Sequence, residues 1–433
     1  MAIEALLIII FVMAVFLVIG VPISYAIAIS SLMAILQSVP ADVSVLTAAQ
    51  RTFVGMSKFS LTAIPFFILA GNLMNQGGIA RRIVNFVLAI LGKVSGALLV
   101  TNVGANALFG AISGSASAAA AAVGSMVREG EEEEGYEPAV CAATNGASAP
   151  SGLLIPPSNA MITYSLASGG TSVAALFLAG YVPGIIWALA CVAGAIIIAK
   201  KKGYRGSEGN FDWKNLGKAT VEALPALSLI VVVIGGIIGG IFTATEGSAI
   251  AVVYALVLGV IYKNITLKSF WDATVEAAKM SGMVIFLIGV SNILGWVMAF
   301  TQIPQAISEV LLGLTDNQYV ILLIMNLILL IVGTFMDVTP AILIFTPLFL
   351  PIVKSFGMHP VHFGLILIYN LCIGNITPPV GNTLFVAIKI GKTSLGKVMP
   401  YMLLYYVFIL IGLLLVTYIP FVSLGLPALS GLV

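Results

Sequence analysis

Two proline-broken stretches inside long apolar segments constrain the fold of this chain most strongly. Residues 145–160 read N-G-A-S-A-P-S-G-L-L-I-P-P-S-N-A, and residues 370–383 read N-L-C-I-G-N-I-T-P-P-V-G-N-T. A proline pair removes two backbone donors and fixes φ, so an ordered helix is interrupted there. In hydrocarbon such a break survives only where protein, water or a bound ion satisfies the freed backbone groups. The two stretches therefore predict broken helices around a cation and substrate site at mid-membrane.

The composition indicates that these breaks lie in a membrane. Of 433 residues, 60% are hydrophobic and 8% are charged, whereas a soluble domain has roughly 25% charged residues. We expect an all-α polytopic membrane protein with about ten to twelve crossings of about 20 residues each. The N-terminal segment is expected to be a transmembrane helix, not a removed signal. The basic loop at residues 200–205 is expected to be cytoplasmic, and no basic stripe indicates a nucleic-acid partner.

The glycine and proline positions that interrupt helices repeat in the two halves of the chain. At an offset of 222 residues Pro156 matches Pro378, and Gly152 matches Gly374. Interruptions at corresponding positions of two halves are the sequence sign of a transporter with internal repeats. The residues themselves leave open whether the second repeat is inverted, which depends on the number of crossings in each half.

Each half also contains a segment that suits a re-entrant hairpin. Residues 110–128 are rich in glycine, alanine and serine, and the tip is expected near residues 113–117. Close helix packing through small residues is the alternative for this segment. The second candidate, residues 333–353, contains an acid and several prolines. Amphipathic pieces at residues 79–93 and 267–279 are expected to lie along the membrane interface.

Oxygen-bearing residues at these hairpins and breaks are candidate sodium ligands. Sodium favours several oxygen ligands, and unwound backbone near half-helix ends provides them without a full buried charge. The candidates for a first site are Ser113, Ser115, Ser117, Gly152, Pro156, Ser158 and Asn159. The candidates for a second site are Thr334, Thr339, Gly374, Asn375, Thr377, Pro379 and Asn382. For any single Ser or Thr, a hydroxyl satisfied by its own helix is the alternative, but that alternative leaves the paired breaks unexplained.

Asp337 is the most informative single residue, because an acid deep in apolar sequence is expensive and by default functional. It could bind a cation, coordinate substrate or hold a hairpin. The candidate substrate residues are Asp337, Ser115, Asn159 and Thr383. No arginine follows Arg205, so recognition of an anion would depend largely on half-helix N-termini and backbone donors.

An enzymatic function is the weaker hypothesis. Ser148 lies in a G-A-S-A-P fragment, and the chain's two histidines are His359 and His362. A Ser/His pair needs hydrogen-bonding geometry, and nothing in the sequence brings these regions together. Two histidines without a carboxylate cluster also make a weak metal site.

The remaining chemistry-bearing residues are expected to be structural. Cys141, Cys191 and Cys372 lie in apolar segments, which favours buried packing over disulfides or metal binding. The acidic run at residues 131–134 is expected to be a solvated loop face. Glu246 begins an apolar segment, and its charge suits a helix N-terminus.

Four motifs together resemble the large membrane subunit of tripartite ATP-independent periplasmic (TRAP) transporters. They are the G-x-x-x-P-P pairs at residues 152–157 and 374–379, P-F-F-I-L-A-G-N-L-M at residues 65–74, and G-T-F-M-D-V-T-P-A at residues 333–341. The resemblance covers essentially the whole chain. It implies a multi-pass protein of the bacterial inner membrane that imports a small organic acid, such as a C4-dicarboxylate or sialic acid, with Na⁺ as the coupling ion and no other cofactor.

The resemblance also implies the architecture and the partners. The fold would contain two inverted repeats, each with a re-entrant hairpin and a broken helix, divided into a scaffold and an elevator-type transport domain. The first sodium site would involve Ser115, Ser117, Gly152 and Pro156, and the second Thr339, Gly374, Asn375 and Thr377, with Asp337 beside the substrate. A small four-helix membrane subunit is expected as a separate chain, together with a periplasmic solute-binding protein.

The resemblance divides the chain into five parts. They are scaffold helices and an interfacial arm at 1–109; transport elements at 110–199, with a hairpin at 110–128 and a broken helix at 138–167; a polar loop at 200–221; scaffold helices and an arm at 222–332; and transport elements at 333–433, with a hairpin at 333–353 and a broken helix at 360–390. The alternative function is a stand-alone sodium:carboxylate symporter that needs no binding protein. A passive channel would need continuous polar faces, which the sequence lacks.

Overall fold

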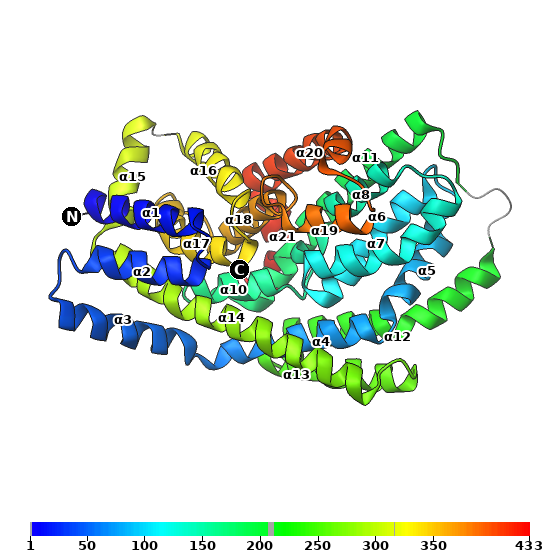
Figure 1. Cartoon of the computed structure of the whole chain (residues 1–433), viewed down its shortest axis with the longest axis horizontal. Coiled ribbons are helices and arrows are strands. Elements are labelled where there is room, and N and C mark those ends of the chain that lie inside the picture. The colour runs from blue at the N-terminus through cyan, green and yellow to red at the C-terminus, as the bar shows by residue number, and fades with distance from the viewer. Residues whose placement is uncertain (1, 207–211, 316) are drawn as a thin grey trace.

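The computed structural model describes residues 2–206, 212–315 and 317–433, and every regular element in these ranges is a helix (Figure 1). The helices of the first half are α1 (Ala2–Val18), α2 (Ile23–Ile35), α3 (Ala41–Met56), η1 (Phe59–Thr62), α4 (Ala63–Gln76), α5 (Ile79–Leu91), α6 (Ala97–Ser113), α7 (Ala116–Glu133), α8 (Pro138–Ser148), α9 (Ser151–Leu154), α10 (Asn159–Ala167) and α11 (Val173–Lys202). The helices of the second half are α12 (Trp213–Ile238), α13 (Ala244–Ile261), α14 (Leu267–Phe300), α15 (Ile303–Leu314), α16 (Gln318–Gly333), α17 (Val338–Ser355), α18 (Pro360–Gly374), α19 (Asn382–Ile390), α20 (Leu395–Tyr418) and α21 (Pro420–Leu429).

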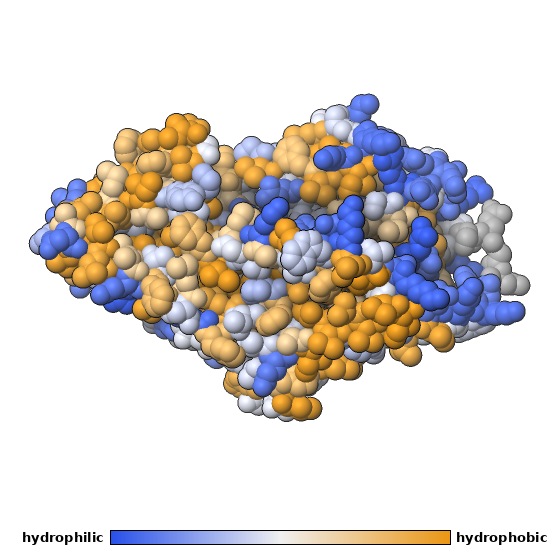
Figure 2. All heavy atoms as spheres, turned by 60° about the horizontal axis from the view of Figure 1, so that its bottom comes forward, coloured by the Kyte–Doolittle hydropathy of each residue, from blue (hydrophilic) through white to orange (hydrophobic). Residues whose placement is uncertain are grey.

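Fewer helices than expected are long enough to cross a membrane. In the described part of the chain six are long and apolar enough, namely α11, α12, α13, α14, α17 and α20. A seventh results if α3 is counted with η1 and α4 as one span, bent by 57°. Other apolar helices, among them α6 and α16, are hairpin arms or half-helices shorter than 18 residues. The expected ten to twelve crossings stay a prediction. Figure 2 shows hydrophobic side chains over much of one face, with hydrophilic side chains gathered at the end of the molecule where α11 ends and α12 begins.

Each half contains a helical hairpin that is longer than the sequence segment assigned to it. α6 and α7 pack against each other, and only Gly114 and Ser115 separate them. Gly114 has a φ of +62°, which glycine adopts without strain, and Ser115 caps α7 by accepting from the Ala118 amide at 3.3 Å. The first arm begins at Ala97, not at residue 110, because α6 continues unbroken to Ser113.

The second hairpin repeats this plan with α16 and α17, joined by residues 334–337. Its first arm therefore begins at Gln318, and the segment 333–353 covers little more than the second arm. Both segments were placed too late in the chain for one reason: apolar composition alone does not distinguish a hairpin arm from a crossing helix.

The proline pairs break the two helices that follow the hairpins. In the first half α8 leads through the four-residue α9 into residues 155–158, which are not helical, and α10 then resumes. In the second half α18 ends at Gly374, and α19 begins at Asn382. The Pro156–Pro157 and Pro378–Pro379 peptide bonds are both cis.

The two broken helices run antiparallel. A Cβ built on Gly146, near the end of α8, would lie 3.1 Å from Leu384 at the start of α19. A Cβ built on Gly391, at the end of α19, would lie 3.3 Å from the Pro138 carbonyl at the start of α8. The two repeats are therefore inverted, and this answers the question that the sequence left open.

The ends of the first broken helix lie on opposite sides of the molecule. Glu137, at the start of α8, pairs with Lys202 at 2.6 Å, so α8 begins beside the end of α11. α11 has 30 residues, and at 1.5 Å per residue it is about 45 Å long. α10 ends near the start of α11, and there Tyr164 donates to the Pro360 carbonyl at 2.6 Å. α18 therefore starts on the side opposite the basic loop.

The helices α2, α3, α4, α13 and α14 form a second group of packed helices. α4 packs against α13, and α14 packs against α2, α3 and α4. α14 is one helix of 34 residues, so the amphipathic piece expected at 267–279 is continuous with the span after it. Thr266 begins this helix by accepting from the Ser269 amide at 3.1 Å. Glu246 forms a capping box with Thr243 at the start of α13, which confirms its predicted place at a helix N-terminus.

The polar connection between the halves is shorter than expected. α11 continues through Lys202, and α12 begins at Trp213. Asp212 caps α12 by accepting from the Lys214 and Asn215 amides at 3.0 Å each. The remainder of the predicted loop at 200–221 is thus partly helical, and residues 207–211 lie outside the described residues.

Candidate functional site

The hairpin tips and the broken helices surround a cavity of about 650 Å³. Six of the residues proposed from the sequence line it: Ser115, Ser117, Asn159, Asp337, Thr339 and Asn375. They come from the starts of α7, α10 and α17, from the residues just before α7 and α17, and from the end of α18. The inverted repeats thus bring together polar groups that are more than 200 residues apart in the sequence.

The helices α2, α4 and α14 supply the opposite wall of this central cavity. Pro22 to Tyr25 at the start of α2, Ile64 and Ile68 of α4, and several residues of α14 between Met280 and Leu287 line that side. This wall is mostly apolar, whereas the repeat side carries the hydroxyl, amide and carboxyl groups. None of the described residues that line the cavity is a lysine or arginine.

The first hairpin tip and the first broken helix meet through Asn159. Its side-chain amide donates to the Gly114 carbonyl at 3.4 Å, and the hydroxyls of Ser115 and Ser117 lie 3.3 Å apart beside it. The Oδ1 atom of Asn159 is buried and has no hydrogen-bond partner. A buried acceptor without a donor is costly, and a bound cation or water would satisfy it.

A close glycine crossing holds the first break against the hairpin. A Cβ added to Gly152 would lie 2.2 Å from the Cα of Gly110 in α6, so neither position has room for a side chain. Pro156 has no amide to donate to the Gly152 carbonyl four residues before it. The Ser158 hydroxyl donates to the Leu153 carbonyl at 2.5 Å. These groups therefore lie behind the cavity wall and shape the break.

The second break is built in the same way. A Cβ added to Gly374 would lie 2.3 Å from the carbonyl carbon of Gly333 in α16. The Thr383 amide donates to the Asn375 carbonyl at 3.2 Å and lies 3.4 Å from the Asn375 Oδ1 atom. The Thr383 hydroxyl oxygen is buried without a partner, as the Asn159 oxygen is in the first repeat.

Asp337 and its neighbours join the second hairpin tip to this break. Asp337 precedes α17, its side chain is exposed to the cavity, and it faces the Asn382 side chain. The Thr334 carbonyl accepts from the Val380 amide at 3.1 Å. A carboxylate at a helix N-terminus is stabilised by the helix dipole, so this acid is placed where a charged group can be held.

The other proposed residues do not line the cavity. Thr334 and Thr377 donate their hydroxyls to the carbonyls of their own helices, both at 2.7 Å, as the alternative reading of such residues anticipates. The proposed residues outside the cavity wall are Ser113, Gly152, Pro156, Ser158, Thr334, Gly374, Thr377, Pro379, Asn382 and Thr383. Sodium binding by any of the proposed residues stays a prediction.

Sequence reasoning missed Thr163 as a cavity residue. Thr163 lies one helical turn after Asn159 in α10, donates to the Asn159 carbonyl at 2.9 Å and lines the cavity. Residues four apart share a helix face, so the spacing from Asn159 was the signal that pointed to it.

The groups considered for enzymatic chemistry are engaged elsewhere. The Ser148 hydroxyl accepts from Asn106 at 2.9 Å, whereas His362 Nδ1 lies 2.5 Å from the Ser423 hydroxyl. The described residues contain no group of three or more histidine, cysteine or acidic residues that could hold a metal ion. The cysteines are free and buried, as predicted.

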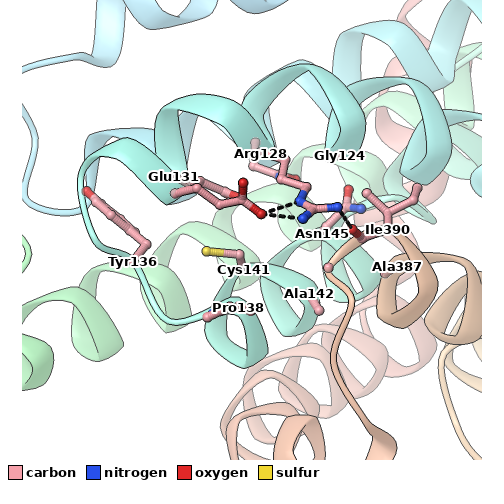
Figure 3. Close-up of a pocket in the computed structure, with 13 residues that line it drawn as sticks. Gly124, Arg128, Glu131, Tyr136, Pro138, Cys141, Ala142, Asn145, Ala387 and Ile390 are labelled. Carbon is pink, nitrogen blue, oxygen red and sulfur yellow. Dashed lines mark hydrogen bonds and ion pairs between the residues drawn. The ribbon is translucent and has the colours of Figure 1, made fainter.

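A second polar cluster, shown in Figure 3, includes Tyr136, whose ring stacks on Tyr204 of the basic loop at 4.1 Å. Glu131 is 4% exposed there, so the expected solvated face is wrong for this residue: α7 continues through it and turns it inward. Arg128 beside it pairs with Glu132 and donates to the Ile390 carbonyl at 2.7 Å.

The Glu131 carboxyl is poorly compensated in this position. Its Oε1 atom is buried without a hydrogen-bond partner. Burial raises the pKa of Glu131 to about 7, against the opposing effects of Cys141, Asn102 and Arg128. Glu131 lies in the last turn of α7, at the end of this hairpin arm that is far from the tip.

Comparisons with known proteins give one consistent picture. Residues 10–422 match the family model described as "Tripartite ATP-independent periplasmic transporter, DctM component". The chain is 50% identical to the uncharacterized protein YgiK of Salmonella typhimurium, over 96% of this chain and 95% of that protein. It is 40% identical to the isethionate TRAP transporter permease protein DctMQ of Oleidesulfovibrio alaskensis, over 94% of this chain and 64% of that longer protein.

Two further comparisons are with a relative that is named for its substrate and with a solved structure. The chain is 37% identical to the C4-dicarboxylate TRAP transporter large permease protein DctM of Rhodobacter capsulatus, over 95% of this chain and 96% of that protein. The crystal structure of the Alcanivorax borkumensis YdaH transporter superposes with a TM-score of 0.65 at 15% identity, covering 89% of this chain and 90% of that one. At this identity the structural likeness supports the fold alone.

Proposed function

Because the chain belongs to the DctM family of tripartite ATP-independent periplasmic transporters, whose members are permeases and not enzymes, we propose that it imports a small organic acid anion on a sodium gradient. The protein is a multi-pass component of the bacterial inner membrane. The large permeases of this family work with a small membrane subunit and a periplasmic binding protein. We propose that both partners act with this chain as separate polypeptides.

The pair of inverted breaks at one cavity is the observation that carries this proposal. Each repeat contributes a hairpin tip, a proline-broken helix and a buried oxygen without a donor, Asn159 Oδ1 in one and Thr383 Oγ1 in the other. Sodium ions bound near these oxygens would satisfy them. Discontinuous helices of inverted repeats hold the coupling ions in this way in other secondary transporters.

The substrate class follows from the cavity and the relatives. A volume of about 650 Å³ lies within the usual range for small-molecule sites. The named relatives transport isethionate and C4-dicarboxylates, so a small carboxylate or sulfonate is the proposed solute here. Backbone donors at the broken helices and the bound sodium ions would then orient its anionic group.

Transport would follow an elevator mechanism. The cavity separates the hairpins and broken helices from α2, α4 and α14, and the first group would slide past the second with its ions and solute. Each sodium ion that moves inward down 100 mV provides about 2.3 kcal/mol, in addition to its concentration gradient. Two or more ions would suffice to accumulate one organic anion.

Uptake in proteoliposomes tests this function. The chain is reconstituted with and without its small subunit and binding protein, and labelled isethionate, a C4-dicarboxylate and sialic acid are offered. We expect uptake of one of these solutes only with an inward sodium gradient. Equal uptake with potassium in place of sodium would refute the coupling. Uptake without a binding protein would favour a stand-alone sodium:carboxylate symporter.

A further inference from the structure

A second cavity lies beside the central cavity along the same helices. Its volume is about 260 Å³. α10, α14 and α17 line both cavities, and on each of these helices the second cavity uses residues further along the chain, such as Ala167, Trp296 and Pro347. The second cavity therefore lies along the same boundary, between α14 on one side and α10 and α17 on the other. A solute that moves along this boundary from the central cavity would reach the second cavity.

Two basic residues distinguish this second cavity from the central one. Arg51 of α3 and Lys58, just after α3, both line it, and no acidic residue is among its described lining residues. The Arg51 guanidinium lies 5.5 Å from the centre of the Trp296 ring. Neither basic residue forms an ion pair within the described residues. Two cations thus face one hollow without a counter-charge.

The second cavity lies toward the side opposite the basic loop. Leu166 and Ala167, which line it, end α10, and α10 ends about one full length of α11 away from Lys202. By the positive-inside rule the side with residues 200–205 is cytoplasmic. The second cavity then faces the outside, where an imported solute arrives. Basic residues are uncommon on the outer side by the same rule. The presence of Arg51 and Lys58 there therefore indicates a functional role.

We propose that Arg51 and Lys58 form an outer anion-binding site that receives the carboxylate or sulfonate group of the solute before it enters the central cavity. The proposal rests on the import of an organic anion proposed above. It explains why no basic residue is among the described residues that line the central cavity: the positive charge that attracts the anion lies at the outer site, and bound sodium ions and backbone donors hold the anion within.

The chemistry of the lining suits a small organic anion. A guanidinium binds carboxylates and sulfonates through paired parallel hydrogen bonds, and the lysine ammonium adds a flexible point charge. Trp296, Ile288 and Pro347 offer apolar surface to a short carbon chain. A fixed positive charge in a partly enclosed hollow raises the local concentration of anions and their rate of entry.

Fluorescence quenching of Trp296 tests this site in the full chain without requiring transport. Iodide serves as the anionic quencher and acrylamide as the neutral one, with the chain in phosphatidylcholine nanodiscs. The Trp296 signal is the difference between the wild-type chain and Trp296→Phe. We expect Arg51→Gln with Lys58→Gln to lower the iodide quenching constant roughly tenfold and to leave acrylamide quenching unchanged.

Matched variants and competitors make the result specific. Lys268→Gln removes an exposed charge at the other end of α14 and should change neither constant. Arg51→Lys keeps the charge and should keep iodide quenching. Isethionate or succinate should protect Trp296 from iodide in the wild-type chain more strongly than chloride at equal ionic strength. Equal iodide quenching in the wild-type chain and the double variant would overturn the proposal.

Two further measurements distinguish solute binding from lipid binding, and the outer site from sodium coupling. If isethionate and succinate give no protection, and protection appears only when phosphatidylglycerol is added to the nanodiscs, the occupant is a lipid phosphate and the solute site is refuted. In uptake assays the double variant should raise KM roughly tenfold with little change in kcat. Loss of the sodium requirement with quenching intact would refute the coupling proposal and leave this site standing.

Discussion

Replacing Gly152 with alanine tests the glycine crossing that sets the position of the first helix break. Gly152 does not have a positive φ, so alanine can adopt its backbone conformation, and only the contact with α6 is perturbed. The added Cβ would lie 2.2 Å from the Cα of Gly110. Carbon atoms in contact rest about 3.5–4.0 Å apart. The backbones must therefore separate by more than about 1 Å.

The size of the effect follows from this overlap. Overpacking of a closed contact costs about 1–3 kcal/mol, and here both partners are backbone, so neither can swing aside. Gly235 is the matched control, because it lies within α12 and a Cβ there would meet nothing within 4 Å. Alanine at such a helical position stabilises by about 0.5–1 kcal/mol. The two variants should therefore differ by about 1.5–4 kcal/mol.

Thermal unfolding of the purified variants measures this difference. We expect Gly152→Ala to lower the Tm by several degrees, and Gly235→Ala to leave it unchanged or slightly higher. Gly152→Ala should also reduce sodium-dependent uptake, because the hairpin tip moves away from the break. If the Tm and the uptake of Gly152→Ala equal those of the control, the close packing of α6 on the break does not matter, and the reasoning is wrong.

Three further predictions concern charged and polar groups at the two clusters. Asp337→Ala should abolish sodium-dependent uptake while the Tm stays within a few degrees of wild type; uptake at the wild-type rate would remove this acid from the mechanism. Thr383→Val should abolish sodium-dependent uptake in a folded protein, because it removes the buried Thr383 oxygen near which the second sodium ion is proposed to bind; uptake at the wild-type rate by this variant would remove the second sodium site. Burial raises the pKa of Glu131 from 4.5 to about 7, so unfolding releases a proton between these pH values and stability falls as pH rises through this window. Glu131→Gln should flatten that dependence and raise stability at pH 8 by up to about 3 kcal/mol, and an unchanged pH profile of the Tm would contradict the burial argument.

Local features of the sequence predicted the centre of the fold well. The proline pairs at residues 156–157 and 378–379 do break their helices, because a missing backbone donor acts regardless of tertiary context. Gly114 and Ser115 separate the two arms at the expected tip, since a positive φ and a helix cap are also local properties. Repeat spacing then predicted that both breaks would share one site.

Features that depend on tertiary packing were not predictable in this way. Hydropathy did not separate the hairpin arms α6 and α16 from true crossings, because both kinds of helix are apolar. The continuity of α14 through residues 267–300 arises from its packing along α2, α3 and α4, which no local pattern records. Glu131 looked solvated within its acidic run, and only the placement of α7 against α6 and α8 buries it.

Sodium ions that complete the two broken helices should stabilise the folded chain, and a sodium titration of thermal stability measures this effect. A ligand that binds only the folded state at a hundred times its Kd stabilises by about 2.7 kcal/mol. We expect the Tm to rise steadily with sodium concentration at constant ionic strength and not to rise with potassium or choline. Thr383→Val, which removes a buried oxygen without a hydrogen-bond partner, should lose much of this rise. A Tm that responds equally to all three cations would contradict sodium binding at the broken helices.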